Sequence, residues 1–390
     1  MNEGFSFRLG PLSIRLEGEH QVVRWARVAF APVACDEQEM SLVIRFTDSA
    51  VHPCSPTAVG DDRASVGKDT VSFRSNPYEM RISAMGGGDA RYLVEFHLRD
   101  RRSLWRRTCG DLEEAYKMWL SHGASPDMHL LKTFAYSYSP LPILAALLHR
   151  GAGLIHASGF SVGGEGVLLP AWGGGGKSTV CTRAVLQGRA DFLSDDHSIV
   201  DSAGNMHLHM MPIHTYAYHL DQDAALRERV LGSCTVSNRF AWSLAMKIRR
   251  HRAVRWVSPA TVFGSDRLAQ RAPIHEVILL YRADVPDFVW ESCSPAEAAA
   301  PCVGVMLSEV SDLTDRLARA EAGWEPGFLP SLGETHSRLK TVYEQAFSHG
   351  SCARLLIPRA CDGDRLVAFL RTKSERIDRA MATSRPADGA

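Results

Sequence analysis

Short alternations of apolar and polar residues dominate the first hundred positions of the chain. They are clearest in four segments, at 5–16, 21–31, 40–46 and 92–98. Alternation with a period of two is typical of strands that bury one face. Residues 52–68 lack such a period and predict an exposed loop. We therefore expect a smaller, mainly β domain over residues 1–125, with a role in recognition or in oligomerisation.

The pattern becomes helical further along the chain. Apolar side chains recur at intervals of three and four at Leu112, Ala115, Met118 and Trp119, and a second helix is predicted over 140–149. An apolar strand at 166–169 then precedes the stretch AWGGGGKST, a helix at 179–186, a strand at 192–194 and two aspartates. Strand, glycine loop, helix, strand and acidic pair in this order are typical of a phosphate-binding βαβ unit.

The glycine loop carries the chemistry of this unit. Residues 171–178 match the pattern GxxxxGK[ST] except at the first position, which is Ala171. Four glycines (Gly173, Gly174, Gly175 and Gly176) allow the backbone to turn its N–H groups inward around phosphate oxygens. Lys177 would neutralise the phosphates of ATP, and the hydroxyl of Ser178 or Thr179 would bind Mg²⁺. The alternative is a loop that only turns the chain, but the strand before it and the helix after it favour a nucleotide site.

The acidic pair follows the next strand. Asp195 and Asp196 lie about twenty residues after Lys177, at the predicted carboxyl end of a strand. Carboxylates beside a phosphate loop can bind Mg²⁺ and take a proton from an attacking hydroxyl. The negative charge of one carboxylate also raises the pKa of its neighbour, which suits that neighbour to act as a base. The alternative is that the two aspartates cap a turn.

The composition narrows the class of protein. The chain of 390 residues is long enough for two domains. Lys and Arg together number 44, as do Asp and Glu, so the chain lacks the excess positive charge of a nucleic-acid or anionic-membrane binder. The apolar run at 141–148 is far shorter than the roughly 20 residues of a membrane span. With nine cysteines, no CxxC pair and no readable signal peptide, we expect a cytoplasmic protein with reduced thiols.

Three runs together resemble a known family: IHASG at 155–159, the glycine loop ending in GKST, and LSDD at 193–196. They are similar to the HPr kinase/phosphorylase family and its related serine kinases, which share a fold with phosphoenolpyruvate carboxykinases. The resemblance is most specific over 154–201 and continues weakly at 275–284 and 352–370. It implies an α/β fold with a phosphate-loop kinase domain over 130–378, after the mainly β domain and before a flexible tail at 379–390.

The resemblance also implies roles for single residues. His156 matches an active-site histidine, and Lys177 and Ser178 match the phosphate-binding and metal-binding positions. Asp195 and Asp196 match an acidic pair in which one residue takes the proton of the substrate serine and the other, here assigned to Asp196, helps Ser178 to hold Mg²⁺. Without the resemblance, His156 would be interpreted as a half-buried histidine with a structural role.

Differences between this sequence and the bifunctional members of the family bear on the acceptor of the phosphoryl group. Thr179 stands where the bifunctional enzymes that act on HPr carry glutamate, and their later Glu-Ile-Arg-Gly signature is absent. The pattern is nearer to stand-alone HPr-kinase-like enzymes, some of which phosphorylate a serine of a precursor peptide, including those of lasso peptides. We expect transfer from ATP to a serine-type hydroxyl. The alternatives are a nucleotide-binding regulator without catalysis and a kinase of a small hydroxylated metabolite; a homo-oligomer stays open.

Two further clusters are candidates for binding. The segment 239–255 is basic and free of acidic residues, so Arg249, Arg250 and Arg252 are candidate contacts to phosphate or substrate, or else a solvated basic face. Four histidines, His207, His209, His214 and His219, fall within a short span. A metal site is one interpretation and the surface near the active site is the other.

Overall fold

The computed structural model describes residues 4–37, 39–47, 64–67, 69–75, 78–86, 91–98, 139–186, 189–222, 224–232, 236–249, 254–311, 314–315, 318, 321 and 328–382. The chain divides into two compact units. The N-terminal unit comprises Met1–Arg150, Phe240–Arg249 and Val310–Arg338, and the C-terminal unit comprises Gly151–Arg239, Arg250–Glu309 and Leu339–Ala390. The predicted domain boundary at 125–130 lies outside the described residues, and no described helix is long and apolar enough to cross a membrane.

The N-terminal unit is built on a seven-stranded sheet. Its strands are β1 (Phe5–Leu9), β2 (Leu12–Glu17), β3 (Leu42–Thr47), β4 (Ala64–Gly67), β5 (Thr70–Ser75), β6 (Tyr78–Ala84) and β7 (Tyr92–Leu98), in the order β1-β2-β3-β7-β6-β5-β4. β3 pairs in parallel with β2 and β7, and the other pairs are antiparallel. Alternate residues of β3 are buried (Leu42, Ile44 and Phe46), as the period of two predicts.

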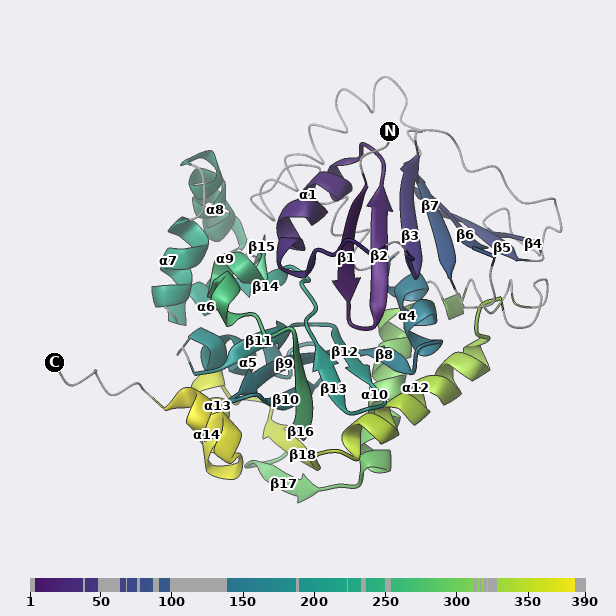
Figure 1. Ribbon diagram of the computed structural model, residues 1–390. Coiled ribbons are helices and arrows are strands. Elements are labelled where there is room, and N and C mark those ends of the chain that lie inside the picture. The colour runs from purple at the N-terminus through teal and green to yellow at the C-terminus, as the bar shows by residue number, and fades with distance from the viewer. Residues whose placement is uncertain are drawn as a thin grey trace. The chain divides into compact units, whose positions relative to one another are not determined.

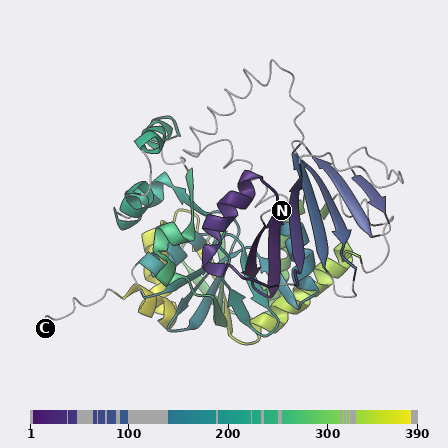
Figure 2. The same ribbon diagram turned by 45° about the horizontal axis from the view of Figure 1, so that its top comes forward.

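One predicted strand of this unit is wrong. Residues 21–31 form helix α1 (Gln21–Ala29) and the start of the short 3-10 helix η1 (Ala31–Val33), and α1 lies beside β1 in both views (Figure 1, Figure 2). The side chains of Val22, Ala26 and Ala29 are buried at a spacing of three and four, a helical period that the β-branched valines obscure. The ring of His20 caps the helix by accepting a hydrogen bond from the Val22 N–H.

The predicted loop over 52–68 also needs correction. Residues 64–67 form strand β4, which pairs with β5, whereas 52–63 lie outside the described part of the chain. The predicted helix at 112–122 lies outside it as well. The helix predicted over 140–149 is confirmed as α4 (Pro140–Leu148), and all nine of its residues are buried.

The C-terminal unit is built on a nine-stranded mixed sheet. Its strands are β8 (Ala152–Ile155), β9 (Ala157–Val162), β10 (Glu165–Pro170), β11 (Asp191–Ser194), β12 (Ser198–Asp201), β13 (Asn205–His207), β16 (Arg271–Ala283), β17 (Val289–Ser292) and β18 (Ser351–Pro358). The order is β11-β9-β10-β16-β13-β12-β8, and β18 joins β16 and β17. Strands β14 (Ile213–Tyr216) and β15 (Val254–Val257) form a separate pair.

Helices pack on this sheet. α5 (Lys177–Leu186) and α14 (Glu375–Met381) contact β9, α13 (Gly363–Lys373) packs against α5, and α10 (Pro295–Glu309) contacts β8 and β18 (Figure 1). The remaining described helices are α6 (Ala217–Gln222), α7 (Ala224–Gly232), α8 (Val236–Arg249), α9 (Pro259–Phe263), η5 (Ser265–Arg267) and α12 (Leu332–Phe347). Residues 379–381, which the sequence assigned to the tail, form the end of α14, where Ala380 and Met381 are buried.

The strand directions decide where the functional residues meet. β10 and β11 both run antiparallel to β9, so they point the same way on either side of it. β16 is parallel to β10, and β18 is parallel to β16. The carboxyl ends of these four strands therefore share one edge of the sheet, which is where open α/β sheets bind their ligands. The glycine loop follows β10 at this edge, and the acidic pair follows β11.

Candidate active site

The glycine loop joins β10 to α5, and two of its glycines adopt conformations that favour glycine. Gly174 and Gly176 have positive φ angles of 80° and 96°, which residues with a Cβ rarely adopt. A Cβ on Gly175 would lie 2.7 Å from the Cβ of Ala171. Alanine is therefore accommodated at the first position of the motif because the fifth position is glycine.

Lys177 opens helix α5 and is 5% exposed. Its Nζ lies 2.8 Å from Nε2 of His156 and 3.2 Å from Oδ1 of Asp196. Since an ammonium group only donates, Nε2 of His156 accepts this hydrogen bond. Burial, followed by the charge of Lys177, lowers the pKa of His156 to about 4, so the imidazole is neutral. The other ring nitrogen, Nδ1, faces Oε1 of Glu309 at 3.7 Å.

The two aspartates have different surroundings. Asp195 is 4% exposed, and its Oδ1 accepts hydrogen bonds from the hydroxyl groups of Ser158 and Ser178, the latter at 2.8 Å. Asp196 lies at a φ of 62° and is the one non-glycine residue with positive φ among those described. Its Oδ2 accepts a hydrogen bond from Nδ1 of His214 at 2.9 Å. Ser178 is thus paired with Asp195, not with Asp196.

These surroundings shift the pKa values of the two aspartates in opposite directions. Burial, and then the charge of Asp196, raises the pKa of Asp195. Burial acts in the same direction on Asp196, but the hydrogen bond from His214 and the charge of Lys177 outweigh it and hold its pKa well below the ordinary value. Asp196 is consequently ionised over the whole physiological range.

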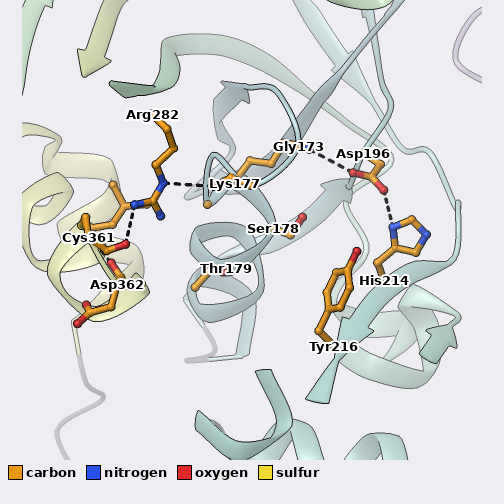
Figure 3. Close-up of a pocket in the computed structure, with 14 residues that line it drawn as sticks. Gly173, Lys177, Ser178, Thr179, Asp196, His214, Tyr216, Arg282, Cys361 and Asp362 are labelled. Carbon is orange, nitrogen blue, oxygen red and sulfur yellow. Dashed lines mark hydrogen bonds and ion pairs between the residues drawn. The ribbon is translucent and has the colours of Figure 1, made fainter. Parts of the chain in front are cut away.

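Lys177, Ser178 and Asp196 face a cavity of about 390 Å³ at the carboxyl edge of the sheet, whereas His156 and Asp195 lie behind its lining. Its lining comprises Gly173, Gly174, Gly176, Lys177, Ser178, Thr179, Asp196, His214, Tyr216, Arg282, Cys361, Asp362, Gly363 and Leu366. Figure 3 shows Arg282 and Asp362 at one end of the cavity and Asp196 and His214 at the other, with Lys177 between them. A glycine loop and a buried lysine are suited to bind a phosphorylated ligand, and the ionised carboxylate can accept a proton or help to hold a cation.

Arg282 is a cavity residue that the sequence analysis missed. Its Nε donates to the carbonyl of Gly174 at 3.3 Å, and one terminal nitrogen donates to the carbonyls of Pro358 and Cys361 at 3.0 and 2.6 Å (Figure 3). One guanidinium group therefore ties the glycine loop to the turn after β18. Its position at the end of the strand HEVILLYRAD was the available signal, because such strand ends gather at the ligand edge.

The remaining candidates from the sequence are the basic segment and the other clustered histidines. Arg249 ends helix α8, and Arg250 and Arg252 lie outside the described residues, so the basic segment stays a prediction. His207 pairs with Asp201, and Nδ1 of His209 donates to the carbonyl of His197. In the part of the chain that is described, no three His, Cys, Asp or Glu side chains are grouped to hold a metal ion.

Comparison with known proteins gives distant likenesses among solved structures alone. No protein-family model and no curated protein matches the chain. Among solved structures, the chain is similar to the HPr(Ser) kinase/phosphatase from Coxiella burnetii, with 11% sequence identity and a TM-score of 0.27 over 58% of this chain and 97% of that one. The relation is remote, and we infer the function from the residues of the cavity.

Proposed function

We propose that the protein is an ATP-dependent kinase that transfers the γ-phosphoryl group to a serine-type hydroxyl. The observation that carries this proposal is the cavity in which the glycine loop, Lys177 and Ser178 face an ionised Asp196. Phosphoryl transfer depends mainly on position and on charge stabilisation, so a small set of such groups is sufficient. A nucleotide-binding regulator would need the loop, Lys177 and a carboxylate for Mg²⁺, but it would not need a second carboxylate placed to take a proton.

The residues also fit Mg²⁺, the metal ion that such a reaction uses. Mg²⁺ takes oxygen ligands and is held in kinases by one or two carboxylates together with substrate phosphates. Ser178 and Asp195 offer adjacent oxygens, and Oδ2 of Asp195 is buried without a hydrogen-bond partner among the described residues. We therefore assign the metal to Ser178 and Asp195 instead of the Asp196 expected from the sequence. When bound there, the ion would neutralise charge on the phosphates.

The chain's own residues then have distinct tasks. Lys177 and the loop N–H groups bind the phosphates, and neutral His156 orients the Lys177 ammonium group. The bond from the γ-phosphorus to the bridging oxygen breaks and a bond to the acceptor oxygen forms. The proton of the acceptor hydroxyl passes to Asp196. Asp196 is ionised and can accept this proton, and the reaction depends mainly on positioning and charge stabilisation.

The acceptor that we propose is a serine of a precursor peptide. Its support is the sequence resemblance of GKST to the stand-alone kinases, with Thr179 after the serine. A small hydroxylated metabolite is the second candidate. A panel of peptides with internal or C-terminal serines, tested beside free hydroxylated metabolites and followed by the gain of phosphate mass, separates these classes.

The first test is phosphoryl transfer by the purified protein with ATP and Mg²⁺. We expect Lys177→Ala and Asp196→Asn each to lower transfer by about 100-fold or more. Lys340→Ala, in which a lysine of α12 loses an ion pair with Glu344, is the matched control and should retain activity. Binding of ATP that needs Lys177, without transfer to any acceptor, would favour the regulator; failure to bind any nucleotide would contradict both.

A further inference from the structure

The carboxylate of Asp196 is held from two sides. Oδ1 lies 3.2 Å from Nζ of Lys177, and Oδ2 lies 2.9 Å from Nδ1 of His214 (Figure 3). The residue itself is in the left-handed region, with a φ of 62°. For a residue with a Cβ this conformation is unfavourable, and it persists where the surroundings fix it. The side-chain contacts of Asp196 are therefore part of what keeps its carboxylate in the cavity.

The two partners of Asp196 come from different places and have different tasks. Lys177 belongs to the phosphate-binding end of α5, so its positive charge is shared with the phosphates in the proposed function. His214 lies on β14, a strand outside the nine-stranded sheet, and has no such task. The contact with His214 is the one that does not compete with phosphate binding.

We propose that His214 is a positioning residue that holds Oδ2 of Asp196 and so leaves Oδ1 to accept the proton of the acceptor hydroxyl. This inference rests on the kinase function proposed above. Because an ionised carboxylate only accepts hydrogen bonds, Nδ1 of His214 carries the hydrogen. The histidine thus fixes both the rotation of the carboxylate and the oxygen that remains available.

The surroundings of His214 suit this role. Trp256, its neighbour across the β14–β15 pair, meets the imidazole edge-on with ring centroids 3.7 Å apart. The side chain is 23% exposed and its Nε2 is buried, so Nδ1 is the ring nitrogen that contacts Asp196 in the cavity. A ring held by packing orients its hydrogen bond with little loss of entropy on each turnover. A metal-binding role, the other interpretation of His214, lacks a group of three ligands among the described residues.

The experiment compares His214→Asn with His214→Gln. The amide nitrogen of asparagine reaches about the position of Nδ1 and keeps the donor, whereas that of glutamine reaches the position of Nε2. We expect transfer to fall about 10- to 100-fold in His214→Gln and to stay within about threefold of wild type in His214→Asn. The dissociation constant for ATP should change by less than about threefold in both, because the phosphate-binding groups are untouched.

Two further measurements separate positioning from a general loss of structure. The thermal midpoint of the unliganded protein should be the same for His214→Asn and His214→Gln. In a double-mutant cycle, adding His214→Gln to Asp196→Asn should lower phosphoryl transfer no further, because the carboxylate that His214 orients is already absent. His207→Gln removes the histidine of a similar pair, with Asp201, on β13, and should leave transfer unchanged.

The outcomes are distinct. Equal transfer by His214→Asn and His214→Gln, with wild-type transfer intact, would overturn the positioning role and leave the kinase function standing. A loss of ATP affinity in either variant would also overturn it, because His214 would then act on binding. Absence of phosphoryl transfer by the wild-type protein would overturn the kinase function and this inference together.

Discussion

At the scale of single residues, Arg282 shows how one side chain links segments far apart in the sequence. Its guanidinium group donates to Gly174 in the glycine loop and to Pro358 and Cys361 after β18. Hydrogen bonds from a charged donor contribute about 1.5 to 3 kcal/mol, more than those between neutral groups. The conformation of the loop therefore depends on a residue more than a hundred positions away.

We expect Arg282→Ala to weaken ATP binding by about tenfold, because the glycine loop loses the contact that holds the carbonyl of Gly174 away from the ligand. Titration calorimetry with ATP measures the change. Arg354→Ala is the matched control, since Arg354 lies on β18 outside the cavity lining and pairs with exposed Glu291. Equal affinities of the two variants would show that the loop keeps its shape without Arg282.

Sequence patterns at this scale identified residues that are close together in the chain. The loop from Ala171 to Ser178 and the aspartate pair were recognisable because a phosphate loop needs its residue types at fixed spacing. His214 and Arg282 line the same cavity from two strands, β14 and β16, and no local spacing in the sequence encodes that these strands meet there. Whether each has its proposed role stays a prediction.

At the scale of elements, the turn between β12 and β13 depends on one carboxylate. Asp201 accepts hydrogen bonds from the backbone and side-chain amides of Asn205 and from Nε2 of His207. Burial acts to raise the pKa of Asp201, but these hydrogen bonds outweigh it and lower the pKa. A carboxyl group with a lowered folded-state pKa stabilises the fold above its unfolded pKa, and this contribution is lost as the pH falls.

We expect Asp201→Asn to lower the free energy of unfolding by about 1 to 2 kcal/mol at pH 7. The difference from wild type should shrink below about pH 4, where the unfolded aspartate also binds its proton. Urea unfolding at the two pH values checks both statements. Asp191→Asn, which breaks an exposed pair with Arg267, should cost less than about 0.5 kcal/mol. A difference that is constant with pH would exclude the ionised carboxylate as its cause.

The error at α1 shows what a pattern of apolar residues leaves undecided. In QVVRWARVA, three valines and a tryptophan favour a strand by propensity, whereas the buried positions follow a helical period. Burial against the rest of the fold decides between helix and strand, because the residue types of this segment and the spacing of its buried positions favour different structures. The runs of β3 and β7 were unambiguous because alternation and propensity agreed there.

At the scale of the molecule, three histidines are buried in one region of the C-terminal unit. The rings of His156 and His209 lie 5.9 and 6.5 Å from the ring of His197. Burial is the largest cause that lowers the pKa of each to about 4. An unfolded histidine has a pKa of about 6.5, so the unfolded chain binds protons that the folded chain excludes.

We therefore expect the fold to lose stability as the pH falls from about 6.5 to about 4, by up to roughly 1.4 kcal/mol per pH unit for each histidine. At pH 5, unfolding should be accompanied by the uptake of about three protons by these side chains. His209→Gln should lower this number by about one. Unfolding curves at pH 7, 6 and 5 give the slope. A free energy of unfolding that does not change over this range would show that the histidines are solvated.

The turn at the other end of β9 and β10 has a practical use. Gly163 and Gly164 connect these strands with φ angles of 60° and 83°, and among the described residues no heavy atom beyond the chain neighbours lies within 4 Å of a Cβ built on either. His156 and the glycine loop lie at the opposite ends of the same two strands. An affinity tag or fluorophore inserted between the two glycines would therefore anchor the protein to a sensor surface by one edge while the cavity edge stays accessible to nucleotides and peptides.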